Sequence, residues 1–492
     1  MKEKFTIFKA LSILPKKIKY NIFLSIFLNM VNVILDLISI ITIYPLVSFI
    51  IDTKNTKLIK FYDNILNDFN IEDESKLQFL ILFFCSSLLI KNFILIINKY
   101  YIAKISRDIY YNTSYRLYLE ILSKKFIDIY DKKKSVLIKN IREIPMEFKA
   151  YFDVYINYIF NIANICIIIF GLIIFDAKIT FLLLLYAALT SFIYSIVFMK
   201  KSKNWGSDAN KTIGKLYTLI YDTLNLLEEI KLHNTTSYFI STFKKIASKW
   251  SFLHFKITFI SSITRPLFEI LLVLLIFLFV IFFKQHQLNV ELFPLVAVYL
   301  YSAFRVLPSL VNLNILKLKQ NTYYYAVNYV FDEFKANTIR DNISKINQVV
   351  DLNLKESIEL KNISFRYPNS EKEILKNINL KINKNQFIGI MGSSGKGKTT
   401  LIKIILGIIE PSSGSISFDK QNINNFKKKY MNSLSYVSQK LYLINDTIKK
   451  NIAFGINEEL IDKDKIWKSL NLASADQFVN QIQNKLEYVI LN

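Results

Sequence analysis

Long apolar stretches recur through the first 307 residues, and their length restricts the fold more than any other feature. Each can supply the roughly 20 residues with which an α-helix crosses the hydrocarbon core of a bilayer. The chain is 52% hydrophobic but also 21% charged, so apolar residues must be concentrated in some regions and polar residues in others. The six predicted membrane helices cover about residues 21–51, 77–102, 152–175, 179–199, 257–283 and 292–307.

The first apolar stretch predicts an uncleaved membrane helix. It follows a basic amino terminus, is too long for the core of a signal peptide, and is not followed by a small-residue cleavage site. The two cysteines, Cys85 and Cys166, lie in apolar stretches and are expected to be packing residues. The three histidines share no ligand spacing, so they do not predict a metal site.

The net charge of +24 is distributed as a membrane protein distributes it, with +17 in residues 1–350. Residues 104–149 carry eleven Lys or Arg, and residues 200–256 are again Lys-rich, whereas the other connections are short or less basic. Because basic loops stay in the cytoplasm, both termini are expected there, in a multi-pass protein of the inner (plasma) membrane. No zinc-binding spacing or RNA-binding signature accompanies the charge, so membrane lipids and not nucleic acid are the expected partners.

The connection at residues 52–76 has apolar residues at helical spacing. It predicts either an amphipathic helix lying on the outer leaflet or a surface helix packed on its neighbours.

The pattern changes after Ala336, which divides the chain into a transmembrane domain at 1–335, a polar linker at 336–355 and a second domain at 356–492. Short apolar runs that follow the linker predict strands, including a compact one at 387–390. A glycine-rich loop comes next, and then a predicted helix that ends at Gly407. Strand, glycine loop and helix in this order form the context of a phosphate-binding loop.

Four of the chain's ten glycines lie between Gly389 and Gly397, and GSSGKGKT at 392–399 matches the phosphate-binding pattern G-x-x-x-x-G-K-[ST]. Glycine lets the backbone curl so that successive N–H groups face an anion, and the following helix presents its positive end. Lys398 is predicted to reach the β and γ phosphates of ATP, and Thr399 to bind Mg²⁺. The predicted nucleotide-binding residues of the loop are Gly392, Ser393, Ser394, Gly395, Lys396, Gly397, Lys398, Thr399 and Thr400.

Four further motifs accompany the loop: FRYP at 365–368, PSSGSISFD at 411–419, SYVSQ at 435–439 and NDTIKKNIAFG at 445–455. With these motifs the chain resembles the ABC transporters of the exporter type. The resemblance implies a multidomain fold: an all-α six-helix transmembrane domain followed by an incomplete α/β P-loop nucleotide-binding domain. It also implies that Tyr367 stacks on adenine, that Gln439 contacts Mg²⁺, and that the chain works as a homodimer or with a partner half-transporter.

Other elements of the family are not recognised in these 492 residues: the LSGGQ-type signature, the Asp-Glu pair that binds Mg²⁺ and polarises water, and the later histidine. The chain is therefore expected to be a fragment, a frameshifted product or a partial gene model, without catalytic residues of its own. Whether it acts as an ATPase or translocase stays open, and an inactive ATP-binding membrane protein is one alternative.

A finer resemblance, to the PglK-type lipid-linked oligosaccharide flippases, is carried by LEEIKL at 227–232, TRPLFE at 264–269 and FRVLPSLVN at 304–312. It implies a lipid-linked oligosaccharide as substrate, with a general lipid, drug or peptide exporter as the alternative. Lys91, Arg265 and Arg305 lie in or beside apolar stretches, where a charge is costly and usually faces a cavity. They are the predicted substrate residues, although Arg265 could instead pair with Glu269 one turn later.

Overall fold

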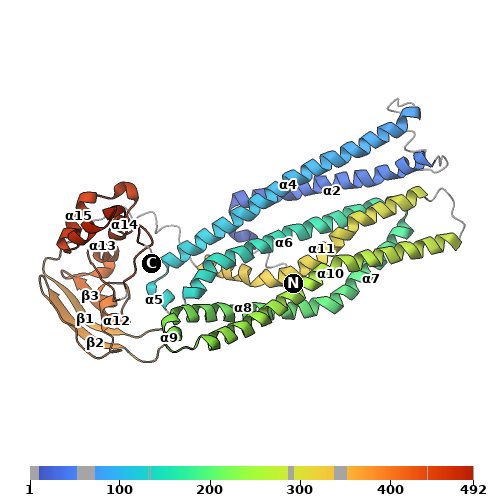
Figure 1. Cartoon of the computed structure of the whole chain (residues 1–492). Helices are drawn as coiled ribbons and strands as arrows, with labels where there is room; N and C mark the ends of the chain where they lie inside the picture. Colours follow the sequence, from blue (N-terminus) through green and yellow to red (C-terminus); the bar gives the residue numbers. More distant parts are fainter. Residues whose placement is uncertain are drawn as a thin grey trace. The chain divides into compact units, whose positions relative to one another are not determined.

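The computed structural model describes residues 10–51, 73–130, 132, 134–285, 293–336, 352–368, 370–439 and 441–490. The chain forms two compact units, Met1–Ile346 and Asn347–Asn492. The first is helical and the second contains a small sheet (Figure 1). The all-α first part and the two-part organisation expected from the sequence are confirmed.

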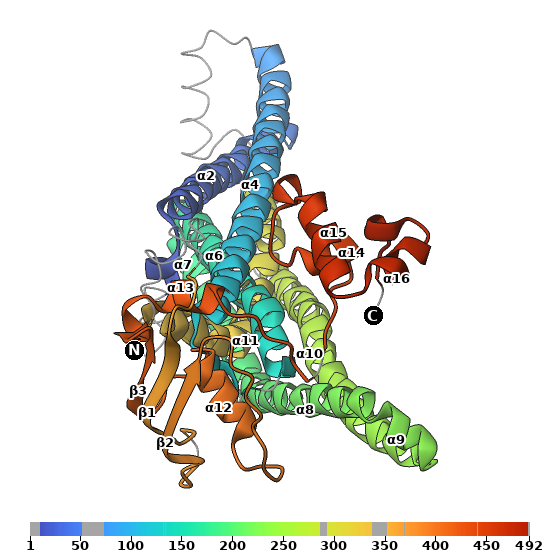
Figure 2. The same cartoon turned by 90° about the vertical axis from the view of Figure 1, so that its left-hand side faces the viewer.

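Unit 1 is built from helices that continue well beyond the predicted membrane spans. They are α2 (Lys16–Ile50), α4 (Asp73–Ser123), α5 (Phe126–Tyr130), α6 (Lys134–Phe175), α7 (Ala177–Tyr194), α8 (Lys200–Asn225), α9 (Leu227–Leu232), α10 (Thr236–Gln285) and α11 (Phe293–Ala336). A π-helical turn at Ser195–Met199 joins α7 to α8. Figure 1 shows α2 and α4 running side by side, and in Figure 2 α9 lies where α8 turns back into α10.

Five helical segments among the described residues are long and apolar enough to cross a membrane: Lys16–Ile50, Ser75–Ser123, Val136–Phe175, Ala177–Phe198 and Phe293–Lys317. The sixth predicted span, 257–283, lies within α10, where part of the side chains lie outside the described residues. The basic stretches at 104–149 and 200–256 are mostly helical rather than looped. The helix predicted at 52–76 lies almost entirely outside the described residues.

Apolar clusters hold the helices of unit 1 together. One such cluster among the described residues joins the N-terminal end of α2, near Ile18, to α4, α6 and α11. Phe148 and Phe152 of α6 are buried in it. Most other large apolar side chains of the predicted spans face outward, which suits a bilayer as solvent. Cys85 and Cys166 are free and exposed, so they are not the packing residues that the sequence predicted.

Unit 2 begins with an antiparallel sheet in the order β2-β1-β3-β4. Its strands are β1 (Ser357–Phe365), β2 (Leu375–Asn383), β3 (Ser413–Phe418) and β4 (Gln421–Asn422). The buried face of β1 carries Ile358, Leu360, Ile363 and Phe365, which alternate with outward-facing residues except at an irregularity in the strand pairing between Leu360 and Ile363. Asp419, in the tight turn between β3 and β4, accepts three backbone N–H groups from Lys355, Glu356 and Ser357.

The helices of unit 2 are short. They are α12 (Lys398–Ile405), α13 (Lys427–Asn432), α14 (Ile448–Ile452), α15 (Lys463–Leu472) and α16 (Asp476–Gln481). Tyr430 of α13 is completely buried, and its hydroxyl donates to the carbonyl oxygen of Ile405 at 2.5 Å. Burial raises the pKa of Tyr430 to about 12, so this hydroxyl keeps its proton and ties α13 to the end of α12.

Candidate nucleotide site and charged residues of the membrane helices

The glycine loop precedes α12 and takes backbone angles that other residues adopt only under strain. Gly395 has φ 81° and Gly397, the residue before the helix, has φ 85°. A Cβ on Gly397 would lie 2.8 Å from Cγ2 of Ile374, which is closer than side-chain atoms normally approach. The close approach to Ile374 therefore requires glycine at position 397, whereas Gly395 has no neighbouring atom within 4 Å of a Cβ and is favoured by its positive φ alone.

Lys398 folds back over the loop. Its Nζ atom donates to the carbonyl oxygens of Gly392 at 2.5 Å and Ser393 at 2.8 Å. These bonds hold the loop in a curl around the lysine, although the loop itself stays exposed. A phosphate is a stronger partner for an ammonium group than a carbonyl is, so Lys398 could exchange these bonds for phosphate oxygens.

The two threonines that follow Lys398 point to different surroundings. Thr399 is exposed beside the loop, whereas Thr400 is buried, with its hydroxyl 3.3 Å from that of Tyr367. The N-terminal end of α12 presents unpaired N–H groups and a positive dipole to the loop. A curved glycine-rich backbone, the ammonium group of Lys398 and the exposed hydroxyl of Thr399 are together suited to bind a polyphosphate with its Mg²⁺ ion.

Tyr367 lies close to the loop through its contact with α12. Its ring packs edge-on against Phe365 at the end of β1, with the ring centres 5.0 Å apart. The structure thus brings the predicted adenine platform to the loop. Gln439 is exposed in a segment, 434–439, that forms neither helix nor strand.

The strand predicted at 387–390 is wrong. Residues 386–393 form no strand, and Phe387 is 99% exposed. A strand needs a neighbour to accept and donate its backbone hydrogen bonds, and among the described residues no strand pairs with this segment. An apolar run predicts burial, but it does not supply the partner that makes a strand.

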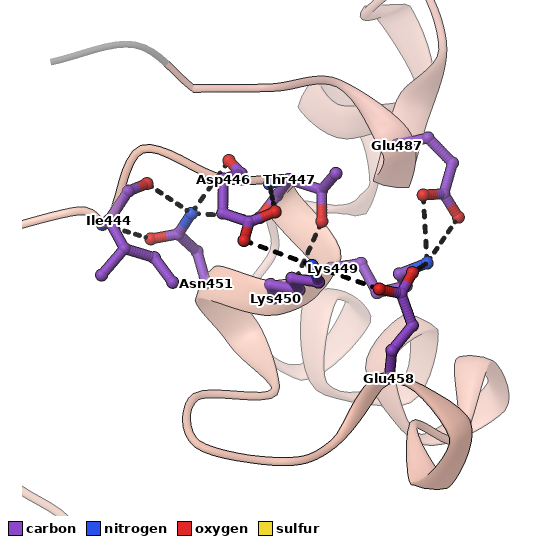
Figure 3. Close-up of polar contacts among 8 residues, drawn as sticks. All are labelled: Ile444, Asp446, Thr447, Lys449, Lys450, Asn451, Glu458 and Glu487. Carbon is purple, nitrogen blue, oxygen red and sulfur yellow. Dashed lines mark hydrogen bonds and ion pairs between the residues drawn. The ribbon is translucent and has the colours of Figure 1, made fainter. Parts of the chain in front are cut away.

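The segment that follows Gln439 is fixed by two polar side chains of α14 (Figure 3). Asn451 exchanges hydrogen bonds with the backbone of Ile444 at 2.9 and 3.0 Å and donates to Asp446 and Thr447. Lys449 is buried, yet its Nζ atom reaches Glu458 and Glu487, each at 3.0 Å. Residues 444–451 are therefore tied to the last helical turns of the unit.

The charges around α14 are mutually stabilised. The hydrogen bonds that Lys449 donates to Glu487, and then those it donates to Glu458, raise the pKa of Lys449. The bonds from Lys449, and then Lys450, lower the pKa of Glu458. Lys449, Lys450 and Glu458 therefore stay charged at neutral pH, so their ion pairs fix the structure of this segment and do not transfer protons.

In the membrane helices, Lys91 and Arg305 lie at one carboxylate, Asp36. Lys91 of α4 forms an ion pair with Asp36 of α2, and Nε of Arg305 lies 3.7 Å from the same carboxylate oxygen. The Asp36 and Lys91 side chains are 7% and 6% exposed, whereas Arg305 is 32% exposed. We call these three residues the Asp36 cluster; it holds two positive charges and one negative charge.

Tyr301 gives Arg305 a second partner. The guanidinium donates to the Tyr301 hydroxyl at 2.7 Å and lies over its ring at 5.1 Å. Arg265 is not brought to this cluster, since it is 76% exposed and pairs with Glu269 at 2.8 Å on its own helix. Two of the three predicted substrate cations therefore converge, and the third does not.

Sequence reasoning missed Asp36, although a signal was present. It belongs to a buried polar row on α2 at three- and four-residue spacing: Asn21, Ser25, Asn29, Asn32, Asp36 and Ser39. Ser25 donates to Asn98 of α4 at 2.7 Å. Like the ion pair between Asp36 and Lys91, this hydrogen bond joins α2 to α4. A polar stripe along an apolar helix indicates a face turned to other helices, which could have pointed to Asp36.

Comparison with known proteins gives a family match for the second unit and several similar proteins. Residues 375–489 match the family described as ABC transporter. Over 134 residues, the chain is 37% identical to an ATP-dependent lipid A-core flippase of Wigglesworthia glossinidia brevipalpis, covering 27% of this chain and 23% of the relative. A Coxiella burnetii protein of the same name is 40% identical over 135 residues, with the same coverage.

A longer match reaches into the membrane helices. The ATP-dependent lipid A-core flippase of Escherichia coli K12 is 24% identical over 318 residues, which is 64% of this chain and 53% of the relative. The chain thus matches from about a quarter to about half of the length of these curated relatives.

Proposed function

From the premise that this chain is an ABC transporter of the exporter type, with membrane and nucleotide-binding regions fused in one polypeptide, we propose that it uses ATP to move an amphiphile across the membrane. One observation carries the proposal: a curled glycine loop with Lys398 at the start of α12 shares a chain with helices that can span a bilayer. The relatives' names, ATP-dependent lipid A-core flippase, support a lipid as the class of substrate.

In the proposed nucleotide complex, the backbone of residues 392–397 surrounds the phosphates and Lys398 meets the β and γ groups. Thr399 binds Mg²⁺, Gln439 approaches it from the segment 434–439, and Tyr367 stacks on adenine. The geometry supports these roles through the exposed Thr399 and the contact between Tyr367 and α12.

Titration of the purified full chain with Mg·ATP tests the site. Lys398→Ala removes the cation that meets two phosphates, and hydrogen bonds to charged groups are worth about 1.5–3 kcal/mol, so affinity should fall about 10- to 100-fold. Lys376→Ala, an exposed lysine of β2, is the matched control and should bind as the wild type does. Equal affinity in wild type and Lys398→Ala would remove the assignment.

The Asp36 cluster supports an anionic head group as part of the substrate, with a lipid-linked oligosaccharide as the finer proposal. One carboxylate cannot neutralise two cations, so the cluster keeps a positive charge on the partly exposed Arg305. An intramembrane charge of this kind is usually functional.

We also propose that two such chains, or this chain and a partner half-transporter, act together, and that the basic helical stretches 104–149 and 200–256 face the cytoplasm. Mass measurement of the detergent-solubilised protein tests the first point, since a strictly monomeric mass would contradict it. For the second, with Cys85 and Cys166 replaced by alanine, Cys introduced at Ser135 should resist an impermeant thiol reagent in intact cells. Cys introduced at Asn64 should react, and the reverse pattern would invert the orientation.

A further inference from the structure

A pocket of about 150 Å³ lies between α6, α7 and α11, and its lining includes none of the three residues of the Asp36 cluster. Its walls come from one face of each helix. Positions 180, 183, 184, 187 and 190 of α7 and positions 299, 302, 303, 306 and 310 of α11 recur at helical spacing. The lining is mainly aliphatic, and it also contains the aromatic rings of Tyr186, Phe268 and Tyr299 and the hydroxyl groups of Thr180, Thr190 and Ser302.

One end of the pocket is closed by hydrogen bonds. The Tyr299 hydroxyl lies 2.8 Å from that of Thr180 and donates to the carbonyl oxygen of Asp176 at 2.8 Å. Near Phe268, the hydroxyls of Tyr194 and Thr264 lie 2.6 Å apart. Because these hydroxyls are already bonded, they hold the helices in place and leave the space between them apolar.

Ser302 is different. It is 1% exposed and lines the pocket, and its hydroxyl oxygen has no hydrogen-bond partner among the residues that the structure describes. A serine in a membrane helix usually bonds to a carbonyl of the preceding turn, as Ser48 bonds to Tyr44 in α2. A buried hydroxyl without a partner is costly, so its presence in an otherwise apolar pocket indicates a group that satisfies it.

We propose that this pocket binds part of the hydrocarbon chain of a membrane amphiphile, and that an oxygen atom which the amphiphile carries next to this chain bonds to Ser302. An apolar cavity of about 150 Å³ stays free of water and accepts a molecule as large as benzene, so the volume suits a short length of hydrocarbon. α6, α7 and α11 each contain a candidate membrane span, so lipid is the surrounding solvent. The inference does not depend on which molecule the protein transports.

Photolabelling of the full chain in nanodiscs tests the site. The probe is a phosphatidylcholine with a diazirine in the middle of one acyl chain, and a second arm uses a polyprenyl phosphate with a diazirine in its chain. Labelled peptides should come from residues 180–190 and 299–310 in wild type. Preferential labelling by the first probe identifies a bilayer lipid, and preferential labelling by the second identifies a prenyl-chain lipid.

Two variants, each with a larger side chain on a different wall of the pocket, are used so that the test still holds if one of them misfolds. Ala303→Phe puts a phenyl ring into the pocket from α11, and Ala187→Leu reduces it from α7. Both should cut pocket labelling several-fold. Leu182→Phe, an exposed position on α7, is the control and should keep it. Equal labelling in wild type and both filled variants would overturn the proposal, as would labelling confined to outward-facing residues.

The role of Ser302 has its own readout, because a merely structural serine would not discriminate between ligands. 1-Decanol should displace the first probe better than decane in wild type and only as well as decane in Ser302→Ala. If Ser302→Ala retains the preference for the alcohol, the hydroxyl does not contact the ligand and that part of the proposal fails.

Discussion

The glycine loop and the Asp36 cluster both gather positive charge, but they neutralise it differently. In the loop, the bonds of Lys398 within the described part of the chain go to backbone carbonyls, which are neutral and can be exchanged for phosphate at little cost. In the cluster, Lys91 and Arg305 share one carboxylate between them. In the loop, an incoming anion could therefore replace the present partners of Lys398. The cluster, in contrast, contains a fixed counterion and a surplus positive charge.

Removing the fixed counterion should have the largest effect. Asp36→Ala leaves Lys91 buried without a carboxylate, and breaking a buried ion pair costs about 3–5 kcal/mol. The double variant with Asp36→Ala and Lys91→Met removes both charges and should recover most of this loss. Reversible unfolding of the full chain in mixed detergent measures both. A double variant no more stable than Asp36→Ala would show that the pair is not the cause.

Removing the surplus charge should affect binding more than stability. Arg305→Ala takes away a charged donor to an anionic head group, which is worth about 1.5–3 kcal/mol, so affinity for a polyprenyl-pyrophosphate-linked glycan should fall about 10- to 100-fold. Native mass spectrometry of the protein with this lipid provides the measurement. Lys99→Ala, an exposed lysine of α4, should bind normally. Unchanged binding by Arg305→Ala would give the cluster a purely structural role.

The shape of the glycine loop can be broken by one methyl group. Gly397→Ala forces a side chain onto a left-handed backbone and into Ile374, at a cost of about 1–3 kcal/mol. Gly389→Ala meets no neighbouring atom within 4 Å and should change little. Limited proteolysis of unit 2 in the full chain at increasing urea compares the two variants. Equal destabilisation by both would mean that the loop tolerates a side chain at Gly397.

The smallest effect concerns acid pH and unit 2. Burial by itself would raise the pKa of Asp419, but the N–H groups of Lys355, Glu356 and Ser357 hold it below the ordinary 3.8. The ionised Asp419 side chain therefore stabilises folded unit 2 at pH values above 3.8. This stabilisation is lost as the pH falls through the lower pKa that Asp419 has in the folded state. The lowered pKa of Glu458 acts in the same direction.

Melting of unit 2 in the full chain, followed by proteolysis, should therefore move down by a few degrees between pH 5 and pH 3. Asp419→Asn should flatten part of this dependence, because an amide does not titrate. A pH profile of Asp419→Asn that matches the wild type would exclude Asp419 as a source.

The two regions also differ in how far the sequence predicts them. The glycine loop is eight consecutive residues whose backbone conformation is fixed locally, so its place before a helix was predicted correctly. Asp36, Lys91 and Arg305 come from three helices, and only packing brings them together. Arg265 shows the limit of counting charges in apolar stretches, because its own helix supplies Glu269 as a partner.

The strands show the same division between local and distant causes. Short apolar runs predicted the strand that is β1, and its neighbours β2 and β3 lie within the next 60 residues. The apolar run at 387–390 has an equally suitable composition but is not paired among the described residues. Hydrophobicity predicted a membrane helix at about 77–102, but α4 continues to Ser123. Its last part is more polar, so hydrophobicity alone did not reveal that the helix continues.

The central claim is that a nucleotide at the glycine loop and an amphiphile at Arg305 bind the same chain and influence each other. ATP-driven transport requires such coupling, and coupling between two binding sites is reciprocal. The measurement is the affinity of the full chain in nanodiscs for a polyprenyl-pyrophosphate-linked glycan, with and without Mg·ATP. The account predicts that Mg·ATP changes this affinity about 5-fold or more in wild type and not in Lys398→Ala. The same affinity with and without Mg·ATP in wild type would contradict it.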